Sequence, residues 1–262
     1  MKGNKKKVKV IDLLISQYPN MERSSLLALI AAKSVSVDGE GARDSQQTFP
    51  EGSMCTIHVS KYVSRGGTKL EHALYTWNID VNELEFVDAG SSSGGFTDCL
   101  LQKGAKKVHC VDVGYNQLDY RLRVDKRVVV HEKTNIMHVD PLIVEVDAAV
   151  ADLSFRSITG AASHILSLTR QKWMISLIKP QFELTSEQEE FSGVITDPHL
   201  LYKTLLSVYD SLKAEGVGLK AIIDSPITGR KGNREFLAFL TLSFGLTKDE
   251  FIKEITNLVQ EK

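Results

Sequence analysis

Four charged residues stand at the predicted ends of elements that are otherwise built to be buried, and their types suit an assisted proton transfer. They are two amines and two acids: Lys69, Asp152, Lys179 and Glu235. Asp152 follows the apolar run "AAVA", and Lys179 follows "WMISLI", where a turn residue is the usual ending. An amine accepts a proton only when its pKa is lowered, which a neighbouring cation or desolvation can achieve. We interpret the four residues as a candidate catalytic group; a solvated lysine and a surface glutamate are the alternatives.

The elements that would position these residues follow from the pattern after about residue 84. Short apolar runs alternate there with helical stretches, which is typical of a parallel sheet covered by helices on both faces. Strands are predicted in "LEFVDAG", "KVHCVDVG", "RVVVHE", "DAAVADLS", "WMISLIKP", "VGLKAIIDS" and "FLAFLTLS". Ligands of such sheets bind beyond the carboxyl ends of the strands. The predicted fold class is α/β, with a Rossmann-like, mostly parallel sheet in residues 84–262, preceded by a basic, glycine-rich loop and a helix in residues 61–83.

Residues 1–60 have a different pattern, which predicts a small α+β domain. Helices are expected in "VKVIDLLISQY" and "MERSSLLALIAAK", the second opened by Ser24 or Ser25. The run "SVSVDGEGA" alternates and turns at Asp38-Gly39, as a hairpin does, and "SMCTIHVS" adds one more strand.

The stretch "RSSLLALIAAKSVSVDG", from Arg23 to Gly39, resembles the small RNA-binding domain named after ribosomal protein S-four. The resemblance implies that the second helix and the hairpin face RNA, where cations meet phosphates. Together with the lysine-rich start and the linking loop, it gives these candidate RNA-binding residues: Lys5, Lys6, Lys7, Arg23, Lys33 and Arg65. An unspecialised helical cap with a hairpin, and a lysine run that is only a solvated tail, are the alternatives.

The stretch "FVDAGSSSGGFTDC" predicts a ligand loop between a strand and a helix. The strand ends at Asp88, the small residues 90–95 let a ligand approach the backbone, and the helix opens near Phe96. The loop does not match the dinucleotide pattern G-x-G-x-x-G. It is not a phosphate loop either, because Phe96 stands where the lysine is required.

Two polar residues on the following strands complete the pattern of this site. Asp112 ends the next strand, where it could accept hydrogen bonds from ribose hydroxyls, and the amide of Asn135 could read an adenine edge. In this combination the stretch resembles the S-adenosylmethionine site of class I methyltransferases. The cofactor-binding residues that the resemblance implies are Asp88, Gly90, Ser91, Ser92, Gly94, Gly95, Phe96, Asp112, Val113, Asn135 and Asp152. For Asp88, capping the loop and holding its amides is the alternative.

The four charged residues resemble the Lys-Asp-Lys-Glu tetrad of ribose 2′-O-methyltransferases of the FtsJ type. Over essentially its full length the chain looks like the haemolysin A (TlyA) family of rRNA 2′-O-methyltransferases. The motifs that carry this resemblance are "SRGGTKL", "DAGSSSGGFTDCLLQKGA", "VDVGYNQL", "KTNI", "ADLSF", "IKPQFE", "GVITDP" and "SPITGRKGNREFL". The resemblance implies S-adenosylmethionine-dependent methylation of cytidine ribose, with ribosomal RNA or ribosomal subunits as the partner.

The chemistry of that reaction suggests a role for each member of the tetrad. The sulfonium methyl is already activated, so the enzyme must align it with a ribose hydroxyl and assist loss of the hydroxyl proton. Our hypothesis is that Lys179 is the base and that Asp152 orients its amine near the methyl donor. Lys69 and Glu235 then hold the ribose and the network.

Other activities would leave different marks in the sequence. Methylation of exocyclic amines commonly uses an Asn/Asp-Pro-Pro-aromatic loop, whereas this chain has "DLSF". Methylation of pyrimidine carbon needs a cysteine at the cleft, but Cys99 is predicted in a helix and Cys110 in a strand. Membrane activity, as the haemolysin label suggests, and an RNA-binding protein with an idle methyltransferase fold are the remaining alternatives.

Composition limits the class of protein but does not identify its partner. Hydrophobic content of 42% and charged content of 25% are ordinary for globular proteins, and the net charge of −1 says nothing in favour of nucleic acid. No apolar stretch is long enough to span a bilayer, and the basic start lacks the features of a signal peptide. The 3 cysteines have no metal-type spacing, so no metal is expected and a reduced cytoplasm is the expected compartment. The oligomeric state is left open.

Overall fold

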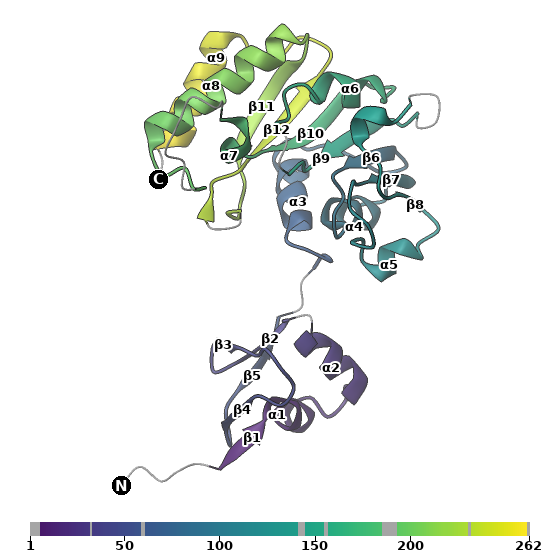
Figure 1. Cartoon of the computed structure of the whole chain (residues 1–262), viewed down its shortest axis with the longest axis vertical. Coiled ribbons are helices and arrows are strands. Elements are labelled where there is room, and N and C mark those ends of the chain that lie inside the picture. The colour runs from purple at the N-terminus through teal and green to yellow at the C-terminus, as the bar shows by residue number, and fades with distance from the viewer. Residues whose placement is uncertain are drawn as a thin grey trace. The chain divides into compact units, whose positions relative to one another are not determined.

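The computed structural model describes residues 6–31, 33–58, 61–140, 145–154, 157–184, 193–229 and 232–260 of the chain (Figure 1). The chain divides into two compact units, Met1–Lys61 and Tyr62–Lys262.

The first unit combines short helices with short antiparallel strands. Its elements are β1 (Lys7–Lys9), α1 (Val10–Gln17), α2 (Arg23–Ala31), β2 (Val35–Val37), β3 (Glu40–Gly41), β4 (Thr48–Pro50) and β5 (Cys55–Ile57). Strand β1 pairs with β4, and β2 lies between β3 and β5. The predicted hairpin turn is confirmed, because Asp38 and Gly39 have positive φ angles of 49° and 86°, as this two-residue turn requires.

Two details of the first unit differ from the prediction. The first helix begins at Val10, because the preceding residues pair with β4 as a strand that has too few residues to show a periodic pattern. The prediction that Ser24 or Ser25 opens the second helix is wrong. That helix already begins at Arg23, and the Ser24 hydroxyl bonds the Glu22 carboxylate at 3.3 Å.

The second unit is built on a seven-stranded sheet in the order β11-β12-β10-β9-β6-β7-β8. Its strands are β6 (Glu85–Ala89), β7 (Lys107–Val111), β8 (Val128–His131), β9 (Ala148–Ala151), β10 (Trp173–Ile178), β11 (Gly218–Asp224) and β12 (Phe236–Thr241). All strand pairs are parallel except those of β12, which runs antiparallel to both β10 and β11. This arrangement confirms the predicted α/β class and mostly parallel sheet.

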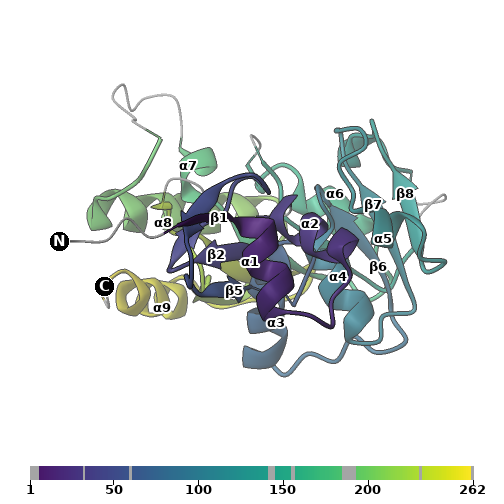
Figure 2. The same cartoon turned by 90° about the horizontal axis from the view of Figure 1, so that it is seen from below.

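Helices cover both faces of this sheet. They are α3 (Gly66–Thr76), α4 (Gly95–Gln102), α5 (Tyr120–Arg123), α6 (Ala162–Ser167), α7 (Pro180–Glu183), α8 (Pro198–Ala214) and α9 (Lys248–Gln260), with a 3₁₀ turn η1 at Ile136–His138. Helices α3 and α4 pack on one core cluster, and α6, α8 and α9 pack on another. Helices α8 and α9 lie side by side in both views (Figures 1 and 2). The rings of Tyr209, from α8, and Phe251, from α9, stack on each other.

The continuous apolar strands follow from this double covering. Along β9, Ala148 and Val150 belong to the cluster beneath α3 and α4, whereas Ala149 and Ala151 belong to the opposite cluster. Successive side chains of a strand point to opposite faces, so a strand covered on both faces must be apolar at every position. The apolar run of β9 therefore ends at Asp152, where the helices no longer cover the strand.

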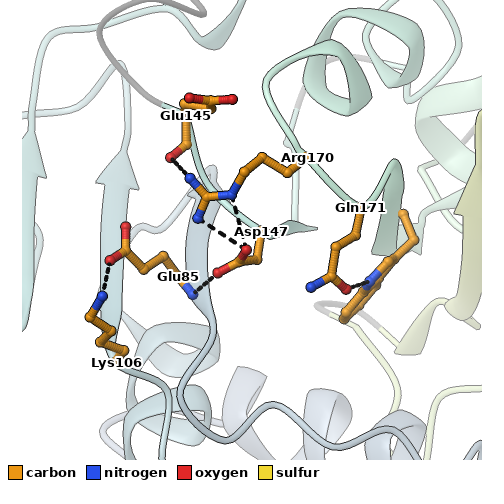
Figure 3. A network of polar contacts seen from close by, with 7 residues as sticks. Glu85, Lys106, Glu145, Asp147, Arg170 and Gln171 are labelled. Atoms are coloured by element: carbon orange, nitrogen blue, oxygen red, sulfur yellow. Dashed lines mark hydrogen bonds and ion pairs between the residues drawn. The ribbon is translucent and has the colours of Figure 1, made fainter.

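The starts of the parallel strands are joined by a polar network (Figure 3). Arg170 donates to Asp147 Oδ1 from Nε at 3.1 Å and from Nη2 at 3.0 Å, and Asp147 Oδ2 accepts the Glu85 amide at 2.9 Å. Lys106 pairs with the Glu85 side chain at 2.9 Å. These contacts connect β6, β7, β9 and the turn before β10 at their amino ends, which leaves the carboxyl ends for a site.

Within the residues that the structure describes, no helix is both long enough and apolar enough to cross a membrane.

Candidate active site

Lys179 lies at the junction of β10 and α7, where Pro180 occupies the first helical position. Proline suits that position because its missing N–H would be unpaired there anyway. Lys179 is 9% exposed, and its Nζ lies 2.6 Å from Asp152 Oδ1 and 2.9 Å from Ser154 Oγ. The contact with Asp152 is an ion pair by distance, although its angles fall outside those of a hydrogen bond. The amine is therefore held by the loop that follows β9.

Lys69 and Glu235 form a second ion pair, from two elements far apart in the chain. Lys69 lies in the first turns of α3 and Glu235 directly precedes β12; their side chains are 9% and 4% exposed and meet through Nζ and Oε2. A Cβ on Gly229 would lie 2.2 Å from Glu235 Oε1, so only glycine fits beside this carboxylate. Two charges this deeply buried are tolerated because each compensates the other.

Strand register brings the two pairs to one edge of the sheet. Ile178 pairs with Phe236 across β10 and β12, so the next pair in this register is Lys179 with Glu235. Directly opposed residues of antiparallel strands have Cα atoms about 4.5–5.5 Å apart and side chains on the same face. Since Lys69 binds Glu235 and Asp152 binds Lys179, all four residues gather at the predicted edge.

Asp88 is the penultimate residue of β6, which ends one residue later than predicted, at Ala89, and the Asp88 side chain is completely buried. Its Oδ2 accepts hydrogen bonds from the amide of Thr97 at 3.1 Å and from its hydroxyl at 2.7 Å, which holds the first turn of α4. Its Oδ1 is buried without a hydrogen-bond partner among the described residues. Burial raises the pKa of Asp88 to about 7, with a further increase from Asp152 and Asp112 and an opposing effect of the Thr97 bonds. The carboxylate thus holds the loop and keeps one oxygen unused.

Because the pKa of Asp88 is raised, the difference in stability between wild type and the Asp88→Asn variant should depend on pH. The carboxyl contributes most stability below its unfolded pKa near 3.8, and this contribution is lost as pH rises through about 7. The free energy of unfolding of the variant, measured in urea, should therefore rise relative to wild type between pH 4 and 7, by up to about 4 kcal/mol. Asp125→Asn is the control, because Arg127 lowers the pKa of Asp125. The free energies of unfolding of wild type and this variant should therefore change in parallel above about pH 5. If the free energies of unfolding of wild type and Asp88→Asn changed in parallel with pH, the raised pKa of Asp88 would be contradicted.

The glycine loop is shaped by its contacts with the protein as well as by its predicted ligand. Gly90 and Gly94 have φ angles of 81° and 91°, in the left-handed region that favours glycine. A Cβ on Gly95 would lie 2.2 Å from Ser64 Oγ and 2.9 Å from the amide nitrogen of Gly67. The loop therefore packs directly on the segment that begins α3 and carries Lys69.

Gly90→Ala should lower affinity for the predicted cofactor. A Cβ there would lie 2.7 Å from the carbonyl oxygen of Asp152, and the left-handed conformation adds about 1–2 kcal/mol of strain. Displacing both the loop and Asp152 should raise the Kd for S-adenosylmethionine at least about 10-fold, measured by isothermal titration. Gly216→Ala is the control, because Gly216 has a φ of 76° but open space around its Cβ position. Equal Kd values for both variants would contradict the role of the loop.

The remaining predicted cofactor residues lie around this loop. Asp112 accepts the Ser92 amide at 2.8 Å and the Gly114 amide at 2.7 Å, so it organises the loop from the neighbouring strand. Val113, directly beside it, is 71% exposed. An exposed apolar side chain next to a loop-bound carboxylate fits the base and ribose of a nucleoside.

Other predicted cofactor residues are partly occupied by structural contacts. The Oδ1 of Asn135 accepts a hydrogen bond from the Met137 amide at 3.0 Å. The predicted contact with adenine would therefore be made by the side-chain nitrogen of Asn135. The side chain of Phe96 is 3% exposed and belongs to the core beneath α3 and α4, so only its backbone is available to a ligand. Ser91 is buried beside the loop glycines.

The predicted RNA-binding residues are distributed over both units. Lys6, Lys7, Arg23 and Lys33 are exposed in the first unit, whereas Arg65 is exposed at the start of α3 in the second. Lys5 lies outside the described residues.

Sequence reasoning missed residues that position the tetrad. Asn233, 4% exposed, lies two residues before Glu235; its Oδ1 accepts the Ile195 amide at 3.1 Å and its Nδ2 donates to the Gly193 carbonyl at 2.7 Å. This contact explains the "GVITDP" motif, which anchors the loop that bears Glu235. Ser154 was also missed. A polar residue in a predicted loop gives no sequence signal of a partner so far along the chain.

Comparison with known proteins identifies the family to which the chain belongs. The family model "FtsJ-like methyltransferase" matches residues 62–242. The chain is 37% identical over 227 residues to the 16S/23S rRNA (cytidine-2'-O)-methyltransferase TlyA of Mycobacterium tuberculosis, covering 83% of this chain and 84% of that protein. Its match to YqxC of Bacillus subtilis is 43% identical and covers 69% of this chain and 66% of YqxC, just under two thirds of that relative.

A solved structure extends the similarity to the whole chain. It is that of a Streptococcus thermophilus protein with a hemolysin designation, which has a TM-score of 0.74, 31% identity, and coverage of 97% of this chain and 96% of its own. The family match spans most of the second unit, including the whole tetrad, and the relatives match over both units. The chain therefore belongs to the FtsJ-like methyltransferase family and, within it, to the group that includes TlyA.

Proposed function

We propose that this chain transfers the methyl group of S-adenosylmethionine to the 2′-hydroxyl of a cytidine ribose in ribosomal RNA. The observation that carries the proposal is the presence of two ion pairs, the buried Lys69–Glu235 and the partly buried Lys179–Asp152, at the edge where the nucleotide-type loop lies. Membership of a methyltransferase family supports the reaction class, and the printed name of the TlyA relative supports the acceptor. Only RNA carries the required 2′-hydroxyl.

The residues around the glycine loop fit the cofactor. Asp112 would hold the ribose, Val113 would contact the adenine, and the small residues 90–95 would admit the rest of the molecule close to the backbone. The buried, unpartnered Oδ1 of Asp88 is a further acceptor beneath the loop. S-adenosylmethionine supplies an electrophilic methyl group.

The tetrad then prepares the acceptor. In this proposal, Nζ of Lys179 would accept the proton of the 2′-hydroxyl while the ribose oxygen bonds to the methyl carbon; the bond between that carbon and sulfur would break, so that S-adenosylhomocysteine leaves. Asp152 and Ser154 fix the direction of Nζ, at 2.6 and 2.9 Å. Lys69, from α3, and Glu235, just before β12, hold the ribose and keep each other in place.

Other acceptors fit this site less well. Cys99 and Cys110 are 0% and 1% exposed inside α4 and β7, so neither can act as the nucleophile of carbon methylation. Two alternative functions have direct tests: dye release from protein-free liposomes for membrane activity, and titration with S-adenosylmethionine for an idle fold.

The RNA partner is proposed to meet the chain through residues 1–60, as the S-four resemblance implies. Lys6, Lys7, Arg23 and Lys33 offer exposed cations there, and Arg65 offers one near the tetrad helix. Residues 61–83 then serve as the linker and leading helix of the methyltransferase domain, 84–262. Ribosomal subunits in the cytoplasm are the substrate in this proposal.

Mapping of 2′-O-methyl positions in ribosomal RNA, with and without this protein, tests the proposal. We expect at least one cytidine to lose its ribose methyl when the protein is removed and to regain it when the protein is restored. Identical maps would overturn the proposed function.

A further inference from the structure

Glu183 ends α7, four residues after Lys179, and its carboxylate reaches the loop that follows β9. Its Oε2 accepts a hydrogen bond from the Ser157 hydroxyl, and its Oε1 accepts one from the Ile158 amide at 2.9 Å. Burial raises the pKa of Glu183, and Glu215 raises it further, whereas the two hydrogen bonds act in the opposite direction. The partly buried carboxylate is thus committed to this loop.

The same loop holds the proposed base. Asp152 and Ser154, which lie in it, both contact Lys179 Nζ. The segment that begins with Lys179 therefore meets the loop twice, once through the amine and once through Glu183. A helix as short as α7 is not stable by itself, so its orientation depends on such contacts.

We propose that Glu183 is a positioning residue for the transfer: it fixes Ser157 and Ile158, which follow β9 in the chain, against α7, so that Asp152 and Ser154 hold Lys179 Nζ toward the acceptor hydroxyl. Glu183 does not touch the reacting atoms. The inference rests on the proposed function and deepens it. A misplacement of about 1 Å at a reacting group can lower a rate by about 100-fold, so a contact of this kind affects kcat more than binding.

Methyl transfer by the full chain tests the proposal, with tritiated S-adenosylmethionine and ribosomal subunits that lack the modification. Glu183→Ala should lower kcat by about 10- to 100-fold and leave the Kd for S-adenosylmethionine within about 2-fold of wild type. Glu183→Gln should restore most of the activity, because its carbonyl can accept the Ile158 amide and its amide group can donate to Ser157. A loss in Glu183→Gln as large as that in Glu183→Ala would overturn the proposal.

Glu215→Ala is the matched control. Glu215 accepts the Gly160 amide at 2.7 Å in the same loop, but it lies at the end of α8 and not on α7. This variant should lose thermal stability with kcat unchanged. Equal kcat in Glu183→Ala and Glu215→Ala, whether both normal or both reduced, would show that Glu183 is only a structural contact.

Two further variants keep the result decisive. If Glu183→Ala does not fold, Ser157→Ala replaces it: a loss in kcat of about 5-fold, equivalent to one hydrogen bond, supports the proposal, and a normal kcat overturns it. Lys179→Ala, assayed in parallel, distinguishes failure of the proposed function from failure of the proposed role of Glu183. Normal turnover by Lys179→Ala would refute the proposed function itself. An inactive Lys179→Ala beside a fully active Glu183→Ala would refute only the role of Glu183.

Discussion

Lys179→Ala is expected to lower methyl transfer by about 100- to 10,000-fold, the range of a lost general base, while the affinity for S-adenosylmethionine stays near that of wild type. The reason is geometric, because Lys179 Nζ is held by Asp152 and Ser154 beyond β10, whereas the predicted nucleoside contacts lie around β6 and β7. Single-turnover transfer to ribosomal subunits and isothermal titration with the cofactor give the two quantities.

Two variants make this result specific. Lys179→Arg places a guanidinium at this position, which carries a positive charge but cannot act as a base, so this variant should be as inactive as the alanine variant. Lys172→Ala removes a lysine from the other end of the same strand, where its Nζ binds the Ser167 carbonyl at 3.1 Å, and should leave transfer unchanged. An arginine variant with more than about one tenth of wild-type activity would show that Lys179 supplies charge and not proton transfer.

Breaking the Lys69–Glu235 pair should give the largest change in stability. Lys69→Met or Glu235→Leu alone leaves one buried charge without its partner, which costs about 3–5 kcal/mol in the free energy of unfolding. The double variant removes both charges and should be more stable than either single variant. All three should lose methyl transfer, because in the proposed mechanism the pair also holds the ribose of the acceptor.

Urea unfolding of the wild type, the single variants and the double variant forms a complete cycle. Lys106 and Glu85 are the control pair; the Lys106 side chain is 58% exposed, and removing that pair should change stability little. Additive losses in the Lys69 and Glu235 cycle would mean that the two charges are not coupled in solution.

The sequence was sufficient to predict the elements that carry Asp152 and Lys179. Each follows an apolar run, and a strand buried on both faces must end where a charged residue begins. The glycine loop and Asp112 could be found for a similar reason, since a small-residue loop between a strand and a helix is a local pattern. The pairing of Lys69 with Glu235 depends on contacts across the fold, and here only the family resemblance connected them.

Strand order could not be predicted from local patterns. Strand β12 follows β11 in the chain but inserts between β11 and β10, and this insertion is what brings Glu235 opposite Lys179. The contacts of Asn233 and Glu183 were missed because hydrogen bonds between loops leave no periodic signal. The strand β1 escaped prediction because Lys7–Lys9 is too short, and its partner β4 lies far along the chain.

The position of the transferred methyl group tests the central claim most directly. The purified chain would be incubated with S-adenosylmethionine that carries a trideuterated methyl group and with ribosomal subunits that lack the modification, and the RNA would be digested to nucleosides for mass spectrometry. We predict that the label appears in the sugar fragment of 2′-O-methylcytidine. Label in a base fragment, or no label in RNA while the protein binds the cofactor, would contradict the account.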